Sequence, residues 1–255
     1  MNKLLNIPDK LLVKFITLET GEYSPFAVHS LELRADTLKH CDVLLVEGIQ
    51  WVSTAIKYLS QSTWSHAAIF VGNIIDPEEH AVDLKLLIEA DVKDGVIGVP
   101  LSRYTHLNTR ILRPVGLTAE DKCRIIGYMM RHLGSSYDLR NVWDLARYLF
   151  PTPPVPVRFR RRMIGLGSGD PSRAICSSLI AQAFQKVRYP ILPRTSETEQ
   201  DETVYSIRHH SLFTPRDFDV SPYFAVIKPT LEKEFDYRSL TWKDELPERE
   251  RLREE

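Results

Sequence analysis

Five short apolar runs between residues 42 and 115 constrain the fold of this chain most strongly. They occupy residues 42–48, 66–72, 84–90, 95–100 and 109–115, and polar or turn-forming segments separate them. Apolar runs of this length are typical of buried strands. Helical patterns are expected at 49–60, 118–133, 141–150 and 173–187, with one last strand at 223–228. We therefore predict an α+β fold, in which a mostly antiparallel sheet carries packed helices on one side.

The chain is long enough for one sizeable domain with additions at its ends. It has 255 residues, 43% of them hydrophobic, and a net charge of −1. We predict an N-terminal extension over 1–40 that packs on the domain, and a domain over 41–230. Residues 151–172 form a basic loop insertion in that domain, and 231–255 form a charged tail. A net charge near zero argues against a nucleic-acid partner.

The sequence predicts a cytoplasmic location without a membrane span. Its first ten residues hold no continuous apolar stretch of the kind found in secretory signals. No segment approaches the ~20 apolar residues that a spanning helix needs. The three cysteines, at 41, 123 and 176, cannot all pair and form no CxxC motif. This cysteine usage indicates a reducing compartment.

Cys176 lies where an apolar-periodic helix is expected to begin. Residues 170–172 (Asp-Pro-Ser) just upstream provide capping side chains and a proline suited to a first helical turn. The positive end of a helix dipole favours the thiolate and lowers a cysteine pKa. Cys176 is therefore a candidate nucleophile, provided that a histidine serves it. Cys123, at helical spacing from Ile126 and Met130, is expected in the core.

His66 and Glu89 are the candidates to assist such a nucleophile. Of the eight histidines, His66 alone opens an apolar strand directly after a polar turn, where a scaffold can hold a base rigidly. Glu89 ends the apolar run 86–88, and a buried carboxylate requires a partner. If the two strands are neighbours and the Cys176 helix packs across them, the three residues form a Cys–His–Glu site. Alternatively, His66 is an ordinary strand-end histidine and Glu89 faces solvent.

Other polar and aromatic features allow a binding role or none. Trp51 and Trp64 flank the segment leading to His66, and either line an apolar cleft for an acyl chain or simply pack. The arginines between 158 and 162 either meet phosphate or anionic lipid headgroups or belong to a solvated loop. Zinc held by the Cys–His–Glu trio is conceivable, but no closely spaced ligand pair supports it. We therefore expect no metal and no other cofactor.

The order of four short segments carries a more specific signal. They are Asp42-Val43-Leu44-Leu45, the strand Ser65–Val71, Ile88-Glu89-Ala90, and Gly134-Ser135-Ser136-Tyr137-Asp138 leading to Cys176-Ser177-Ser178-Leu179. In this order they resemble the permuted papain-like amidases, the YiiX/YebB-type branch of the NlpC peptidase superfamily. The resemblance spans residues 40–228. Histidine and acid precede the cysteine, which is the order that marks the circular permutation of the papain-like fold.

The resemblance implies a role for each candidate residue. Cys176 would be the nucleophile, His66 the general base and acid, and Glu89 the group that orients His66. Tyr137 would lie beside the oxyanion site together with the Cys176 backbone N–H. One departure from the family is that Ser178 occupies a position where the family often has glutamate.

The resulting prediction is a cysteine hydrolase that cleaves an amide or ester bond through an acyl-enzyme. The substrate would be a small peptide, an N-acyl amino acid or a lipid-like molecule. A thiol acyltransferase on lipid-like substrates is an alternative, since lecithin:retinol acyltransferase is a distant permuted relative of the same superfamily. A non-catalytic lipid- or peptide-binding module is a second alternative. The sequence leaves the oligomeric state open.

Overall fold

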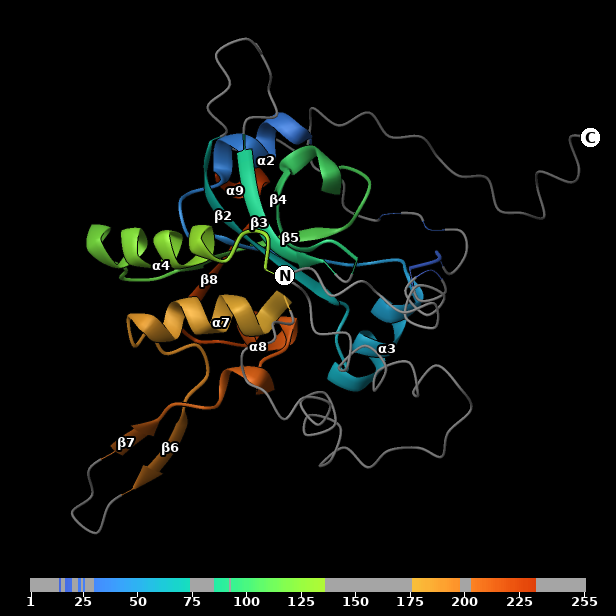
Figure 1. The fold of residues 1–255 in the computed structure, drawn as a ribbon. Helices are drawn as coiled ribbons and strands as arrows, with labels where there is room; N and C mark the ends of the chain where they lie inside the picture. The colour runs from blue at the N-terminus through green and yellow to red at the C-terminus, as the bar shows by residue number, and fades with distance from the viewer. Residues whose placement is uncertain are drawn as a thin grey trace, which may run out of the picture.

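A six-stranded antiparallel sheet forms the centre of the protein (Figure 1). The computed structural model describes residues 14, 17–19, 23, 25, 30–73, 85–91, 93–135, 176–197 and 203–232. The strand order is β4-β3-β2-β1-β5-β8, and each neighbouring pair is antiparallel. The strands are β1 (Val43–Val46), β2 (His66–Asn73), β3 (Lys85–Asp91), β4 (Gly95–Pro100), β5 (Thr109–Pro114) and β8 (Phe224–Ile227). All six predicted strands are confirmed, with shifts of one or two residues at their ends.

The helices connect these strands and cover the sheet. They are α2 (Leu31–Thr37), α3 (Trp51–Ser60), η1 (Leu101–Tyr104), α4 (Ala119–Arg131), α7 (Cys176–Lys186), η3 (His210–Leu212), α8 (Pro215–Asp219) and α9 (Pro229–Glu232). In the part of the chain that the structure describes, no helix is both long and apolar enough to span a bilayer. The helix predicted at 141–150 and the basic insertion at 151–172 lie outside the described residues.

The sheet is buried on both faces, whereas the sequence predicted helices on one side. Val43 and Leu45 of β1 pack in a core with α4 and α7, which run side by side in Figure 1. Leu44 and Val46 point to the opposite face, into a second core that includes residues of α2 and η1. The apolar run of β1 is continuous rather than alternating because both of its faces are covered.

Local sequence signals explain where α4 begins and ends. Thr118 caps its first turn, and its hydroxyl accepts a hydrogen bond from the backbone N–H of Asp121. The Asp121 carboxylate in turn accepts from the Thr118 N–H, which completes a capping box. The chain leaves α4 through Gly134, whose φ of 77° is a left-handed conformation that glycine adopts without strain.

Two features in regions predicted to be irregular are regular in the structure. Residues 190–201 were expected to be loop, but β6 (Arg194–Glu197) pairs with β7 (Thr203–Ser206) in a separate hairpin. The N-terminal region contains α2, whose N-cap Ser30 accepts a hydrogen bond from the Leu33 N–H. Both elements are short, so too few residues repeat for a period to be visible in the sequence.

A buried ion pair ties β1 to β5 and offers a test of the fold. Arg113 donates from Nε to Asp42 Oδ1 at 3.0 Å and from Nη2 to Asp42 Oδ2 at 2.8 Å. Asp42 is fully buried, and burial raises its pKa although Arg113 opposes this. Arg113→Met should lower the free energy of unfolding by about 3–5 kcal/mol in urea titrations, because Asp42 is left without its cation.

The exposed pair on α4 provides the control for that measurement. Arg124 and Glu120 lie 2.5 Å apart at i,i+4 and are 60% and 72% exposed. Arg124→Met should change stability by less than about 0.5 kcal/mol. Equal losses in the two variants would contradict a structural role for the buried pair.

Candidate active site

His66 and Glu89 meet at one end of the sheet, as the sequence predicted for neighbouring strands. His66 is the first residue of β2, and Glu89 lies near the end of the adjacent strand β3. Because side chains alternate along a strand, His66 shares a face with Ala68 and Phe70, and Glu89 shares that face with Leu87. The His66 Nε2 and Glu89 Oε2 atoms are 2.5 Å apart. Glu89 is only 3% exposed, so this contact satisfies an otherwise costly buried carboxylate.

Glu89 has two further partners that sequence reasoning missed. The Tyr104 hydroxyl donates to Glu89 Oε2, the same oxygen that faces His66. Arg103 Nε lies 3.3 Å from Glu89 Oε1 and also reaches Asp91. Both partners belong to η1, which directly follows β4, the strand paired with β3. The sequence indicates only that Arg103 and Tyr104 follow a predicted strand. The pairing of β3 with β4 is what brings them to Glu89.

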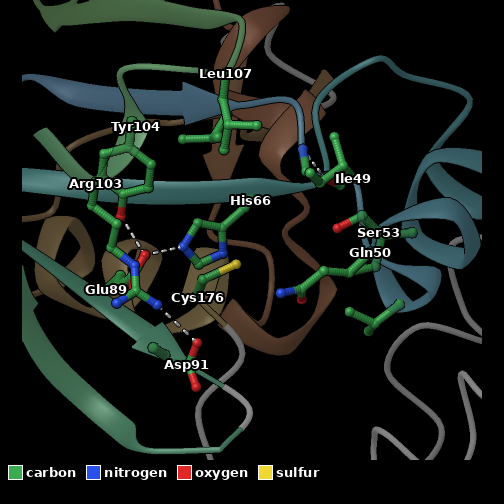
Figure 2. Close-up of a pocket in the computed structure, with 16 residues that line it drawn as sticks. Ile49, Gln50, Ser53, His66, Glu89, Asp91, Arg103, Tyr104, Leu107 and Cys176 are labelled. Atoms are coloured by element: carbon green, nitrogen blue, oxygen red, sulfur yellow. Dashed lines mark hydrogen bonds and ion pairs between the residues drawn. The ribbon is translucent and has the colours of Figure 1, made fainter. Parts of the chain in front are cut away.

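Cys176 reaches the same point from the opposite face of the sheet. It is the first residue of α7, which packs in the core on the Ala67 and Ile69 side. The His66 ring and the backbone N–H groups of Ala67 and Ser177 interact favourably with its thiolate form. Figure 2 shows the sulfur beside the His66 ring, with Glu89 on the other side of that ring. The structure therefore brings together the three residues that the sequence singled out.

The electrostatics of the trio favour an ion pair between thiolate and imidazolium. Burial alone would raise the pKa of Cys176, but His66 and the two N–H groups lower it below that of an ordinary cysteine. Burial alone would lower the pKa of His66, but Glu89 and Cys176 raise it well above its usual value. Burial acts to raise the pKa of Glu89, yet its charged neighbours, His66 first, lower it to about 2. The carboxylate is thus ionised, which holds the imidazolium in place.

A pocket opens onto these residues, between the start of α3 and the ends of β2 and β3 (Figure 2). Its lining combines apolar residues with polar ones, among them Gln50, Ser53 and the charged pair Asp91 and Arg103. The described residues that line it are Val46, Gly48, Ile49, Gln50, Val52, Ser53, Ile56, Ser65, His66, Glu89, Ala90, Asp91, Arg103, Tyr104, Leu107 and Cys176. The arrangement places a nucleophilic sulfur and a proton donor at the floor of an accessible cleft.

The two tryptophans predicted to line the binding site are not among the residues that border the pocket. Trp64 is buried, and its indole N–H donates to Asp219 at 3.2 Å on the α8 side of the molecule. The Arg110 guanidinium lies over the same indole, 5.0 Å from the ring centroid. Trp51 is 36% exposed at the start of α3 and is not among the residues that line the pocket. Tyr137 lies outside the described residues.

The remaining cysteines differ from Cys176 in their surroundings. Cys41 is fully buried, and burial raises its pKa to about 12. Cys123 is exposed on α4, so the prediction that it lies in the core is wrong. Its spacing from Ile126 and Met130 does not mark a buried stripe, since Met130 is itself 44% exposed. Among the residues that the structure describes, no group of three or more His, Cys, Asp or Glu side chains is placed to hold a metal ion.

Comparison with known families finds a similarity over part of the chain. The family model described as permuted papain-like amidase enzyme, YaeF/YiiX, C92 family, matches residues 37–149. The match is a similarity over that part of the chain. The members of that family are described as amidase enzymes. The matched range includes His66 and Glu89 and ends before Cys176, so the position of the thiol comes from the structure.

The chain was also compared with solved structures and with curated proteins. The chain is similar to the crystal structure of the metalloprotein YiiX from Escherichia coli O157:H7, with 14% sequence identity and a TM-score of 0.47. That similarity covers 78% of this chain and 99% of the other. No curated protein matches the sequence.

Proposed function

We propose that this protein cleaves an amide or ester bond through an acyl-enzyme on Cys176, with His66 as general acid and base and Glu89 as the residue that positions His66. The observation that carries the proposal is the placement of the buried Cys176 sulfur beside the His66 ring, whose Nε2 lies 2.5 Å from Glu89 Oε2 on the ring's other side. A nucleophile, a base and an orienting carboxylate in sequence are the arrangement that activates a weak nucleophile.

The chemistry proceeds in two steps. The Cys176 thiolate forms a bond to the carbonyl carbon, and the electron pair of the C=O bond moves to its oxygen. When the tetrahedral intermediate collapses, the bond to the leaving amine or alcohol breaks and the leaving group takes a proton from the His66 imidazolium. His66 then removes a proton from water, the hydroxide attacks the thioester, and the acid product leaves the regenerated thiolate.

The walls of the pocket favour small amino-acid substrates. Ile49, Val52 and Leu107 give part of the lining an apolar surface suited to an acyl group. Asp91 and Arg103, whose closest charged atoms are 3.5 Å apart, present both signs of charge on the side of β3. A peptide or an N-acyl amino acid has apolar and charged parts that match both sides. Among the three substrate classes, we therefore favour these two over lipid-like molecules.

Selective alkylation tests the activated thiol. At about pH 6.5, two units below the usual cysteine pKa of ~8.5, iodoacetamide should modify Cys176 at least about tenfold faster than Cys123. Peptide mass spectrometry after timed quenching gives the three rates. Cys123 controls for accessibility because it is exposed, and buried Cys41 should react slowest. Equal labelling of Cys123 and Cys176, or none at Cys176, would favour a binding module over an enzyme.

A further inference from the structure

The side chain of Gln50 is a polar group of the pocket to which neither the sequence nor the family match assigns a role. Gln50 precedes α3 and lines the pocket together with Cys176. In Figure 2 its carboxamide points from the α3 side into the pocket, toward Cys176. It approaches the sulfur from the side opposite Asp91 and Arg103, so it faces the space where a substrate carbonyl would lie.

Gln50 is poorly suited to the structural role that its position suggests. It is the N-cap of α3, a position where Ser, Thr, Asp or Asn would cap the first turn. The Gln50 side chain makes no capping hydrogen bond. Within the described part of the chain, its carboxamide has no hydrogen-bond partner at all. Residues that break a local rule, here the preference for a capping side chain at a helix start, and gain no local hydrogen bond in return are expected at functional sites.

The backbone that carries Gln50 is nevertheless fixed. Gln50 forms an antiparallel bridge with Glu19, and its carbonyl accepts the Thr54 N–H at 3.1 Å. Gly48 packs so tightly before it that a Cβ there would lie 2.2 Å from Ser53 Oγ. The Gly48 N–H also donates to Ser65 Oγ at 2.9 Å, next to His66. The position from which the carboxamide reaches into the pocket is therefore well defined, and its N–H groups are free to bind a substrate oxygen.

From this placement we propose that the Gln50 carboxamide N–H donates a hydrogen bond to the oxyanion that forms when Cys176 attacks a carbonyl. The inference rests on the proposed function, because an oxyanion forms only if Cys176 is the nucleophile. Gln50 then acts on the substrate oxygen, whereas the N–H groups of Ala67 and Ser177 favour the thiolate of Cys176 itself. The amide dipole stabilises charge that is absent in the ground state, so it lowers the barrier without tightening substrate binding.

Two reactions of the same thiol test this proposal. Attack on p-nitrophenyl acetate develops an oxyanion, whereas alkylation by iodoacetamide develops none. Gln50→Ala should therefore lower the rate of the p-nitrophenolate burst by about 10²- to 10³-fold. It should leave the rate of iodoacetamide alkylation within about twofold of wild type. Gln50→Glu keeps the shape but should lose at least as much of the burst, because its carboxylate repels the oxyanion.

The matched control is the same substitution at the other end of α3. Gln61 is an exposed glutamine just beyond the helix, outside the pocket, so Gln61→Ala should leave both rates unchanged. A burst rate of Gln50→Ala within twofold of the wild-type rate would overturn the inference. An equal loss in the burst rate and in the alkylation rate would also overturn it, because it would indicate a disturbed site. Failure of the proposed function is distinct, because then the p-nitrophenolate release of wild type persists in Cys176→Ala.

Discussion

Cys176→Ala should reduce turnover of p-nitrophenyl acetate by at least about 10³-fold, because it removes the atom that forms the acyl-enzyme. The thiol is only 4% exposed and lies at the first residue of α7, so its loss leaves the body of that helix intact. We expect the free energy of unfolding to change by about 1 kcal/mol or less. Stopped-flow absorbance for the reaction and urea titration for stability measure the two effects on the same preparation.

A second cysteine provides the control that assigns the loss of turnover to Cys176. Cys123→Ala changes an exposed thiol on α4 and should retain wild-type turnover. Intact-protein mass spectrometry of quenched wild-type enzyme should show one added acetyl group that is missing in Cys176→Ala. Full activity of Cys176→Ala would exclude the mechanism. An acyl-enzyme that persists in water but turns over when an amine acceptor is added would instead identify an acyltransferase.

Glu89→Gln should lower the rate of Cys176 acylation by about 10²- to 10⁴-fold, because His66 loses the anion that positions it and stabilises its charge. The substitution keeps the size of the side chain. The Tyr104 hydroxyl can still donate to the oxygen of the new carboxamide, and Arg103 is 45% exposed and can be solvated. The main effect is therefore on the reaction rather than on the fold.

The pH profile separates this role from a purely structural one. In the wild type, the reactive ion pair exists above the lowered pKa of Cys176 and below the raised pKa of His66. Without the Glu89 carboxylate, the imidazolium is less stable, so the His66 pKa falls and the alkaline limb moves to lower pH. The acid limb reports ionisation of Cys176 while His66 is still protonated, so it should move little. The window of iodoacetamide reactivity should narrow from its alkaline side.

An exposed glutamate is the control for the Glu89 variant. Glu120→Gln removes a carboxylate that is 72% exposed on α4, and its profile should superimpose on that of the wild type. A Glu89→Gln profile with unshifted limbs would show that the carboxylate does not tune His66, whatever happens to the rate. Circular dichroism of both variants at each pH excludes loss of fold as the cause of a narrowed window.

The sequence predicted the sheet well because its strands are short apolar runs with clear breaks. It also selected His66 and Glu89, since a polar residue at the edge of such a run is unusual enough to stand out. The same reasoning missed Tyr104, Arg103 and Gln50, which lie in turns or at a helix start with no periodic pattern around them. It misplaced Cys123, because helical spacing from Ile126 and Met130 does not say which side of a helix faces the core.

By itself, the sequence determined the strands and the start of the Cys176 helix. The alternation of side chains along a strand also determined which neighbours share a face with His66 in its strand and with Glu89 in its strand. These are properties of neighbouring residues, set by backbone geometry with a period of two or 3.6. Only the tertiary structure decided that β2 lies beside β3 and that α7 packs on the opposite face, with Cys176 reaching the end where His66 begins. It also decided which turn residues surround Glu89. Such contacts join residues far apart in the chain, and they arise from burying both faces of one sheet.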